Sequence, residues 1–135
     1  MLLTILKSII AIVLGLLSSF ILLYASALGL KWVPSPAHFG GTDMVITGAR
    51  WFITSMVGGF VTAATVRRAP IRHGLIIGGL LAAVIAYGVA WGDLDFFSPW
   101  FIDSMLALVL VAAALGGYLR VVMTNSQARL VHDGT

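Results

Sequence analysis

Three arginines and a histidine lie close together near the middle of the sequence. Arg67, Arg68 and Arg72, with His73, surround Pro70 in a short basic segment, residues 67–73, which we call the elbow segment. Guanidinium groups at a membrane surface bind the phosphate of an anionic lipid or the acidic loop of a partner. We therefore expect these arginines to bind lipid or a partner. The alternative is that each arginine, taken singly, only sets the orientation of the chain in the membrane.

No other group of residues suggests chemistry. The histidines (His38, His73 and His132) are scattered, and the chain has no cysteine and no glutamate. No ionisable residue lies near the middle of an apolar run, where ion-coupled transporters carry one. We identify no nucleophile with a base beside it and no metal-ligand spacing. The sequence therefore predicts no enzyme, no cofactor and no metal site.

The composition is that of an integral membrane protein. Of the 135 residues, 60% are hydrophobic and 10% are charged, and the mean hydropathy is +1.06. A soluble domain has roughly a quarter of its residues charged. The formal charge of +3 is small and dispersed, which argues against a nucleic-acid partner and favours membrane lipids.

Four apolar runs approach or exceed the length that a helix needs to cross a bilayer core of roughly 30 Å. They predict an all-α membrane protein, a four-helix transmembrane bundle in a single domain, 1–135. The spans are expected at about 9–30, 45–66, 74–91 and 101–123, followed by a polar tail at 124–135 that frays at its end. Lys7 and Ala25-Ser26-Ala27 would also fit a signal peptide, but the run between them is long for one.

The basic residues predict the orientation. The three arginines of the elbow segment lie on one side together with Lys7, Arg120 and Arg129, whereas only Lys31 and Arg50 lie on the other side. Cytoplasmic loops carry the excess of Lys and Arg. We therefore expect both termini and the elbow segment in the cytoplasm.

Small residues recur at every fourth position in three of the predicted spans. Residues four apart lie on one helix face, and smooth faces let membrane helices approach closely. The faces could pack within one bundle, or one could receive a helix of another protein. The residues are Ser55, Gly59 and Ala63; Gly74, Gly78, Ala82 and Ala86; and Ala112 and Gly116.

Aromatic residues gather near the expected outer ends of the spans, where Trp and other aromatics anchor membrane proteins at the interface. The predicted anchors are Trp32, Trp51, Trp91, Phe96, Phe97 and Trp100. Arg50 and Asp103 lie near the same ends. They could form an ion pair between the second and fourth spans, or each could reach interfacial water.

A faint internal repeat is present. Gly58-Gly59-Phe60 in the second span corresponds to Gly116-Gly117-Tyr118 in the fourth, and each outer loop has a Trp followed by Ser-Pro. Two like helical hairpins would give this pattern, and so would chance among residues common in membranes.

The central pattern resembles one in small four-span bacterial inner-membrane proteins of unassigned function. It runs from Gly58-Gly59 through Arg67-Arg68-Ala69-Pro70 to His73-Gly74, with Gly116-Gly117 later. The resemblance implies the same topology and a bacterial inner membrane. It implies no catalytic or binding residue.

Abundant packing surface without chemistry predicts a non-catalytic accessory subunit of a larger inner-membrane complex. Its partners would be membrane lipids and other membrane-protein subunits. The alternative is a small homo-oligomeric transporter or channel without ion-coupling charges, in which hydroxyl residues would line a path.

Overall fold

Each predicted span forms an α-helix in the computed structural model. The model describes residues 2–29, 40–66, 69–92 and 97–133, with side chains up to residue 127. All four helices are long and apolar enough to cross a membrane, so the chain is an all-helical, multi-pass membrane protein. The helices are α1 (Leu2–Gly29), α2 (Gly41–Thr65), α3 (Pro70–Ala90) and α4 (Pro99–Asp133).

Local sequence explains where three of the helices begin. At the start of α2, the Asp43 carboxylate accepts a hydrogen bond of 3.0 Å from the Gly40 N–H. Both α3 and α4 begin at a proline, which suits the first helical turn because no N–H is needed there. The third span therefore starts at Pro70, four residues before the predicted start at Gly74, and takes up part of the elbow segment.

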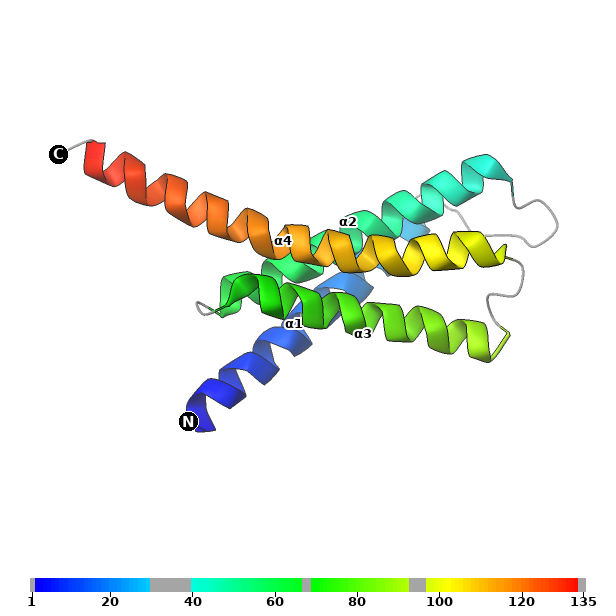
Figure 1. Cartoon of the computed structure of the whole chain (residues 1–135), viewed down its shortest axis with the longest axis horizontal. Coiled ribbons are helices and arrows are strands. Elements are labelled where there is room, and N and C mark those ends of the chain that lie inside the picture. Colours follow the sequence, from blue (N-terminus) through cyan, green and yellow to red (C-terminus); the bar gives the residue numbers. More distant parts are fainter. Residues whose placement is uncertain (1, 30–39, 67–68, 93–96, 134–135) are drawn as a thin grey trace.

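The polar tail predicted after residue 123 is mostly helical. α4 continues to Asp133 and is 35 residues long, because no Gly or Pro occurs between residues 124 and 133 to end it. At 1.5 Å per residue it measures roughly 52 Å, well beyond a bilayer core of roughly 30 Å. Its C-terminal turns extend away from the other helices (Figure 1).

Three helices form the centre of the bundle, and α1 lies outside it. α4 packs along both α2 and α3, and α2 also packs against α3. α1 leans on α2 and touches α3, but its described residues do not contact α4. The two hairpins, α1–α2 and α3–α4, are therefore placed differently in the bundle.

α1 crosses α3 at a steep angle (Figure 1), and its length explains this. Its 28 residues span roughly 42 Å, whereas the 21 residues of α3 span roughly 32 Å. A long apolar helix fits a bilayer by tilting. α3 can therefore stand nearly upright while α1 tilts.

The core consists of two apolar clusters. Trp51 of α2 packs against both of them. One cluster is formed by Ile85, Phe97, Phe101, Met105 and Val109, and the other by Ile77, Leu81 and Ala113.

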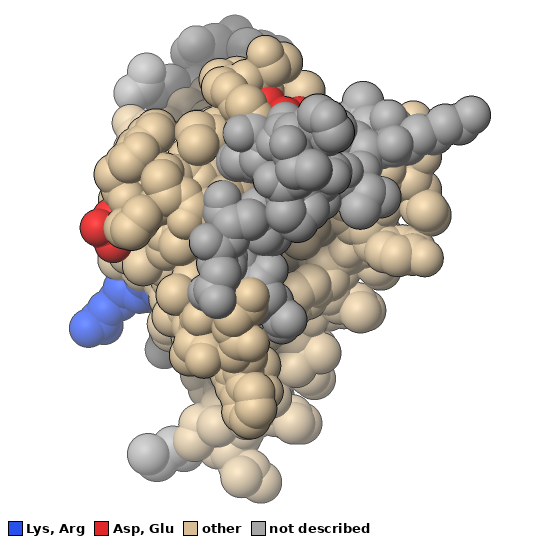
Figure 2. All heavy atoms as spheres, turned by 90° about the vertical axis from the view of Figure 1, so that its right-hand side faces the viewer, with Lys and Arg blue, Asp and Glu red and all other residues tan. Residues whose placement is uncertain are grey.

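The two ends of the bundle differ. The start of α1, the end of α2, the start of α3 and the C-terminal end of α4 lie at one end (Figure 1). We call this the elbow end. Figure 2 shows the opposite end; among the described atoms visible there, uncharged residues predominate and charged ones are isolated near the edges.

Candidate functional site

The crossing of α2 and α4 is made by one glycine from each helix. A methyl group on Gly59 would collide with the carbonyl group of Ala113. One on Gly116 would collide with the carbonyl oxygen of Met56 and lie 2.8 Å from the Phe60 nitrogen. The two helices therefore touch backbone to backbone, as small residues permit in membranes.

The other glycine of each pair packs against the neighbouring helix of its own hairpin. A methyl group on Gly58 would collide with the Ser19 hydroxyl of α1 and lie 3.0 Å from the Gly15 carbonyl oxygen. One on Gly117 would lie 2.8 Å from the carbonyl oxygen of Pro70 in α3. In each pair, one glycine lies at the α2–α4 crossing and the other packs against the adjacent helix of its own hairpin. The order of these two glycines along the sequence is reversed between the pairs.

The small-residue line of α3 turns from the inside of the bundle to the outside. A methyl group on Gly78 would lie 2.9 Å from Leu110 Cα in α4, and Gly74 is likewise buried against α4. Ala82 is half-buried and Ala86 is exposed. Each step of four residues advances about 40° around a helix, so the line winds away from α4.

The other predicted packing residues lie inside the bundle. Ala63 and Ala112 are buried. Ser55 is also buried, and its hydroxyl donates a hydrogen bond of 2.6 Å to the carbonyl oxygen of Trp51. These side chains contribute to packing within the chain.

A second line of small residues on α3 faces away from the bundle. Gly79, Ala83, Ala86 and Ala90 are exposed and follow one another at intervals of four, three and four residues, which keeps them on one helix face. A methyl group on Gly79 would have no neighbour within 4 Å. We call these four residues the outer stripe of α3.

Arg50 connects α2 to α1. Its Nε–H donates a hydrogen bond of 3.0 Å to Ser26 Oγ, and an Nη2–H donates one of 2.9 Å to the Leu23 carbonyl oxygen. Asp103 lies exposed on α4. In the described part of the chain the Arg50 side chain bonds to α1, and the Arg50–Asp103 ion pair stays a prediction.

Most buried hydroxyls bond to helix backbone. Ser19 donates to the Gly15 carbonyl oxygen at 3.0 Å or to that of Thr54, in α2, at 3.1 Å. Thr62 donates to the Gly58 carbonyl oxygen at 2.8 Å. Such bonds satisfy the hydroxyl donor. These hydroxyl protons therefore do not need water as a hydrogen-bond partner. Thr47 differs, since its buried oxygen has no partner in the described structure.

The elbow segment is only partly described. Arg67 and Arg68, predicted to bind lipid or a partner, lie outside the described residues, while Arg72 is exposed on α3. The Nδ1–H of His73 donates to the Ala69 carbonyl oxygen at 3.0 Å, and its Nε2 lies 3.4 Å from Ser8 Oγ of α1. His73 thus connects the start of α3 to α1.

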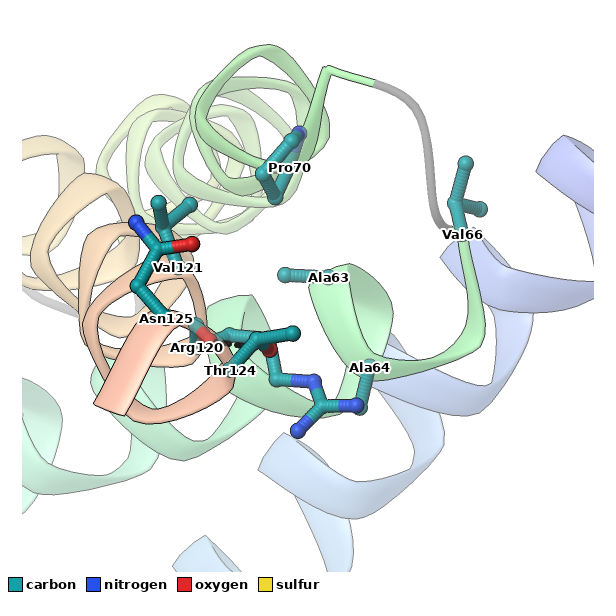
Figure 3. Close-up of a pocket in the computed structure, with 8 residues that line it drawn as sticks. All are labelled: Ala63, Ala64, Val66, Pro70, Arg120, Val121, Thr124 and Asn125. Atoms are coloured by element: carbon teal, nitrogen blue, oxygen red, sulfur yellow. Dashed lines mark hydrogen bonds between the residues drawn. The ribbon is translucent and has the colours of Figure 1, made fainter. Parts of the chain in front are cut away.

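A pocket of about 500 Å³ opens at the elbow end, between the end of α2, the start of α3 and α4 (Figure 3). Arg120 lies half-buried in its wall and extends from α4 toward Ala64. We call it the elbow pocket, and sequence analysis did not identify it. Its lining residues are Ala63, Ala64, Val66, Pro70, Arg120, Val121, Thr124 and Asn125.

The predicted interfacial aromatics have different surroundings. Trp91 and Trp100 are 70% and 63% exposed, as anchors would be. Phe97 is buried and stacks on Phe101 with ring centroids 5.3 Å apart, and Trp51 is half-buried in the core. Phe97 is therefore a core residue. Trp32 and Phe96 lie outside the described residues.

No group of three or more His, Cys, Asp or Glu side chains that could hold a metal ion occurs among the described residues. Comparison with protein-family models, with curated proteins and with solved structures gives no match to the chain. The resemblance to small four-span bacterial proteins therefore rests on the residues quoted for it alone.

Proposed function

We propose that this protein is a non-catalytic accessory subunit of a larger inner-membrane protein complex. Its outer stripe of α3 would pack against a transmembrane helix of a partner subunit. The single observation that carries the proposal is this exposed line of small residues, beginning at Gly79, on a helix whose glycines Gly74 and Gly78 already pack against α4.

The shape of the outer stripe suits a helix better than lipid alone. Large side chains are also exposed on α3, at Leu75, Ile76, Val84 and Tyr87. Along the line of Gly and Ala no large side chain holds a second helix away, so it can approach closely, and close packing drives helix association in membranes. A partner helix with small residues of its own would fit.

The polar groups of the interior favour a packing role over conduction. The hydroxyls of Ser19, Ser55 and Thr62 bond to backbone carbonyl oxygens, and glycines bring α2 and α4 into direct backbone contact. A path through a single chain would need room and free polar groups along its length. In a homo-oligomer the path would have to run between copies.

Replacing Gly79 by Leu tests the proposal. Because a Cβ there meets nothing within 4 Å, the variant should fold normally while its side chain covers the outer stripe. The matched control is Gly48→Leu on α2, where a Cβ also meets nothing within 4 Å. In the native membrane, Gly79→Leu should lose its stoichiometric partner and Gly48→Leu should keep it.

Two results would contradict this proposal. One is a partner that stays bound to both variants. The other is a wild-type protein that, after gentle extraction, forms only a small homo-oligomer with lipid; reconstituted flux would then be the next measurement, for the transporter or channel alternative.

We further propose that the complex lies in a bacterial inner membrane with both termini of this chain in the cytoplasm. Support comes from the distribution of Lys and Arg along the sequence. It also comes from the start of α1, the start of α3 and the C-terminal end of α4, which lie at the same end of the bundle (Figure 1). Reporter fusions at the C-terminus, active only in the cytoplasm or only outside it, test the orientation.

A further inference from the structure

The length of α4 fits a position of the elbow pocket near the level where lipid headgroups meet hydrocarbon. α2 ends at Thr65 and α3 begins at Pro70 beside it. Along α4, Arg120 is 21 residues after Pro99, which corresponds to roughly 32 Å of helix. That is about the thickness of the hydrocarbon core. If α4 enters the core near Pro99, it leaves the core near Arg120.

One cation in the pocket wall is available to a ligand. Within the described part of the chain, the Arg120 guanidinium has no hydrogen-bond or ion-pair partner, although the side chain is half-buried. Asn125 of the same helix also lines the pocket, with its amide on the Pro70 side, whereas Arg120 extends toward Ala64 (Figure 3). The Thr124 hydroxyl donates to the Arg120 carbonyl oxygen at 2.8 Å, so its proton is already used.

The remaining walls are apolar. Ala63 and Ala64 of α2, Val66 after it, and Pro70 and Val121 line the pocket opposite and beside the polar groups. A cavity with one guanidinium, one amide and a mainly apolar lining suits an amphipathic anion. A fully solvated anion would gain little from the apolar side and would lose hydration there.

We propose that the elbow pocket binds the phosphate group of one anionic phospholipid. Arg120 forms a charge-assisted, bidentate pair with the phosphate oxygens, as guanidinium groups do, and the Asn125 amide donates to the headgroup. The glycerol and the first methylenes of the acyl chains lie along Ala63, Ala64 and Val121. At about 500 Å³ the pocket has room for a headgroup.

Native mass spectrometry of the protein released from mixed vesicles of phosphatidylglycerol and phosphatidylcholine tests this inference. We expect one phosphatidylglycerol retained per chain in the wild type. Arg120→Gln should lower the retained fraction by about tenfold, the effect of losing a strong charge-assisted contact. Lys7→Gln is the matched control, because Lys7 is exposed near the N-terminus of α1 at the same end and does not line the pocket.

A second variant separates the pocket from charge alone. Ala64→Phe keeps Arg120 but fills the cavity from an exposed position on α2, and it should also release the lipid. Circular dichroism of each variant confirms that the helices have formed.

Equal loss of lipid in Arg120→Gln and Lys7→Gln would overturn the inference, since it would show a diffuse surface charge effect. Full retention in Ala64→Phe would also overturn it. A titration with inorganic phosphate distinguishes the source of the anion. If phosphate displaces the lipid at equal concentration, the site is one for a soluble anion and the lipid assignment is wrong.

Discussion

Gly78 and Gly79 are adjacent in the sequence but have opposite surroundings, so the same substitution should have opposite effects on stability. Alanine favours a helix over glycine by about 1 kcal/mol at either position. At Gly79 the new methyl group meets nothing within 4 Å, and only this gain remains. Gly79→Ala should therefore stabilise the bundle by up to about 1 kcal/mol.

At Gly78 the methyl group would lie 2.9 Å from Leu110 Cα and 3.2 Å from Ala113 Cβ. Carbon atoms prefer separations of about 3.5–4.0 Å, so α3 and α4 must move apart by roughly half an ångström or more. Such overpacking costs about 1–3 kcal/mol. The helix-propensity gain is common to both variants, and the predicted difference in unfolding free energy between them is therefore about 1–3 kcal/mol.

Reversible unfolding in mixed micelles with an increasing fraction of sodium dodecyl sulfate, followed by circular dichroism, measures this difference. Equal stability of Gly78→Ala and Gly79→Ala would refute the packing of α3 on α4 described above. A Gly79→Ala variant less stable than the wild type would refute the outward position of the outer stripe.

Two further substitutions test the α1–α2 connection and the elbow. Arg50→Met should loosen α1 by removing the hydrogen bonds from Arg50 to Ser26 and Leu23, at a cost of about 1.5–3 kcal/mol for bonds of a charged group. The distribution of spin-label distances between α1 and α4 should then broaden. An unchanged distribution would contradict the described contact. Ala69 precedes α3 with φ 51° and ψ 55°, a left-handed conformation that Asn tolerates better than Ala. Ala69→Asn should therefore raise the melting temperature in detergent, and its Oδ1 can also cap the first turn of α3.

The sequence predicted the four helices well because long apolar runs can do little else in a membrane. It also indicated which residues allow close packing, since Gly59 and Gly116 do bring α2 and α4 together. The start of α3 at Pro70 and of α4 at Pro99 follows from the chemistry of proline.

The arrangement of the helices could not be predicted in the same way. In a bilayer, lipid-facing and helix-facing side chains are both apolar, so the hydrophobic periodicity that orients a helix in a soluble protein is weak. α1 is the clear example, because it buries only Ala11, Gly15 and Ser19 although nearly all of its length is apolar. Nothing in its composition shows that it lies outside the three-helix centre.

The candidate sites were predicted only in part, because they depend on contacts distant in sequence. The elbow pocket brings Arg120 of α4 beside Pro70 of α3, 50 positions away in the sequence, whereas sequence analysis considered only the arginines near Pro70. Likewise, Phe97 resembled an interfacial anchor, but it folds onto Phe101 and closes the core at that end.

The most direct test of the accessory-subunit proposal is site-specific photo-crosslinking from the outer stripe in the native membrane. A photoreactive residue at Ala83, exposed in the middle of the stripe, should crosslink to one other membrane subunit, and the same subunit should be present in fixed ratio in the gently extracted assembly. The control position is Val111, exposed on α4, which should not crosslink to it. Crosslinks from Ala83 only to lipid, or only to a second copy of this chain, would contradict the account.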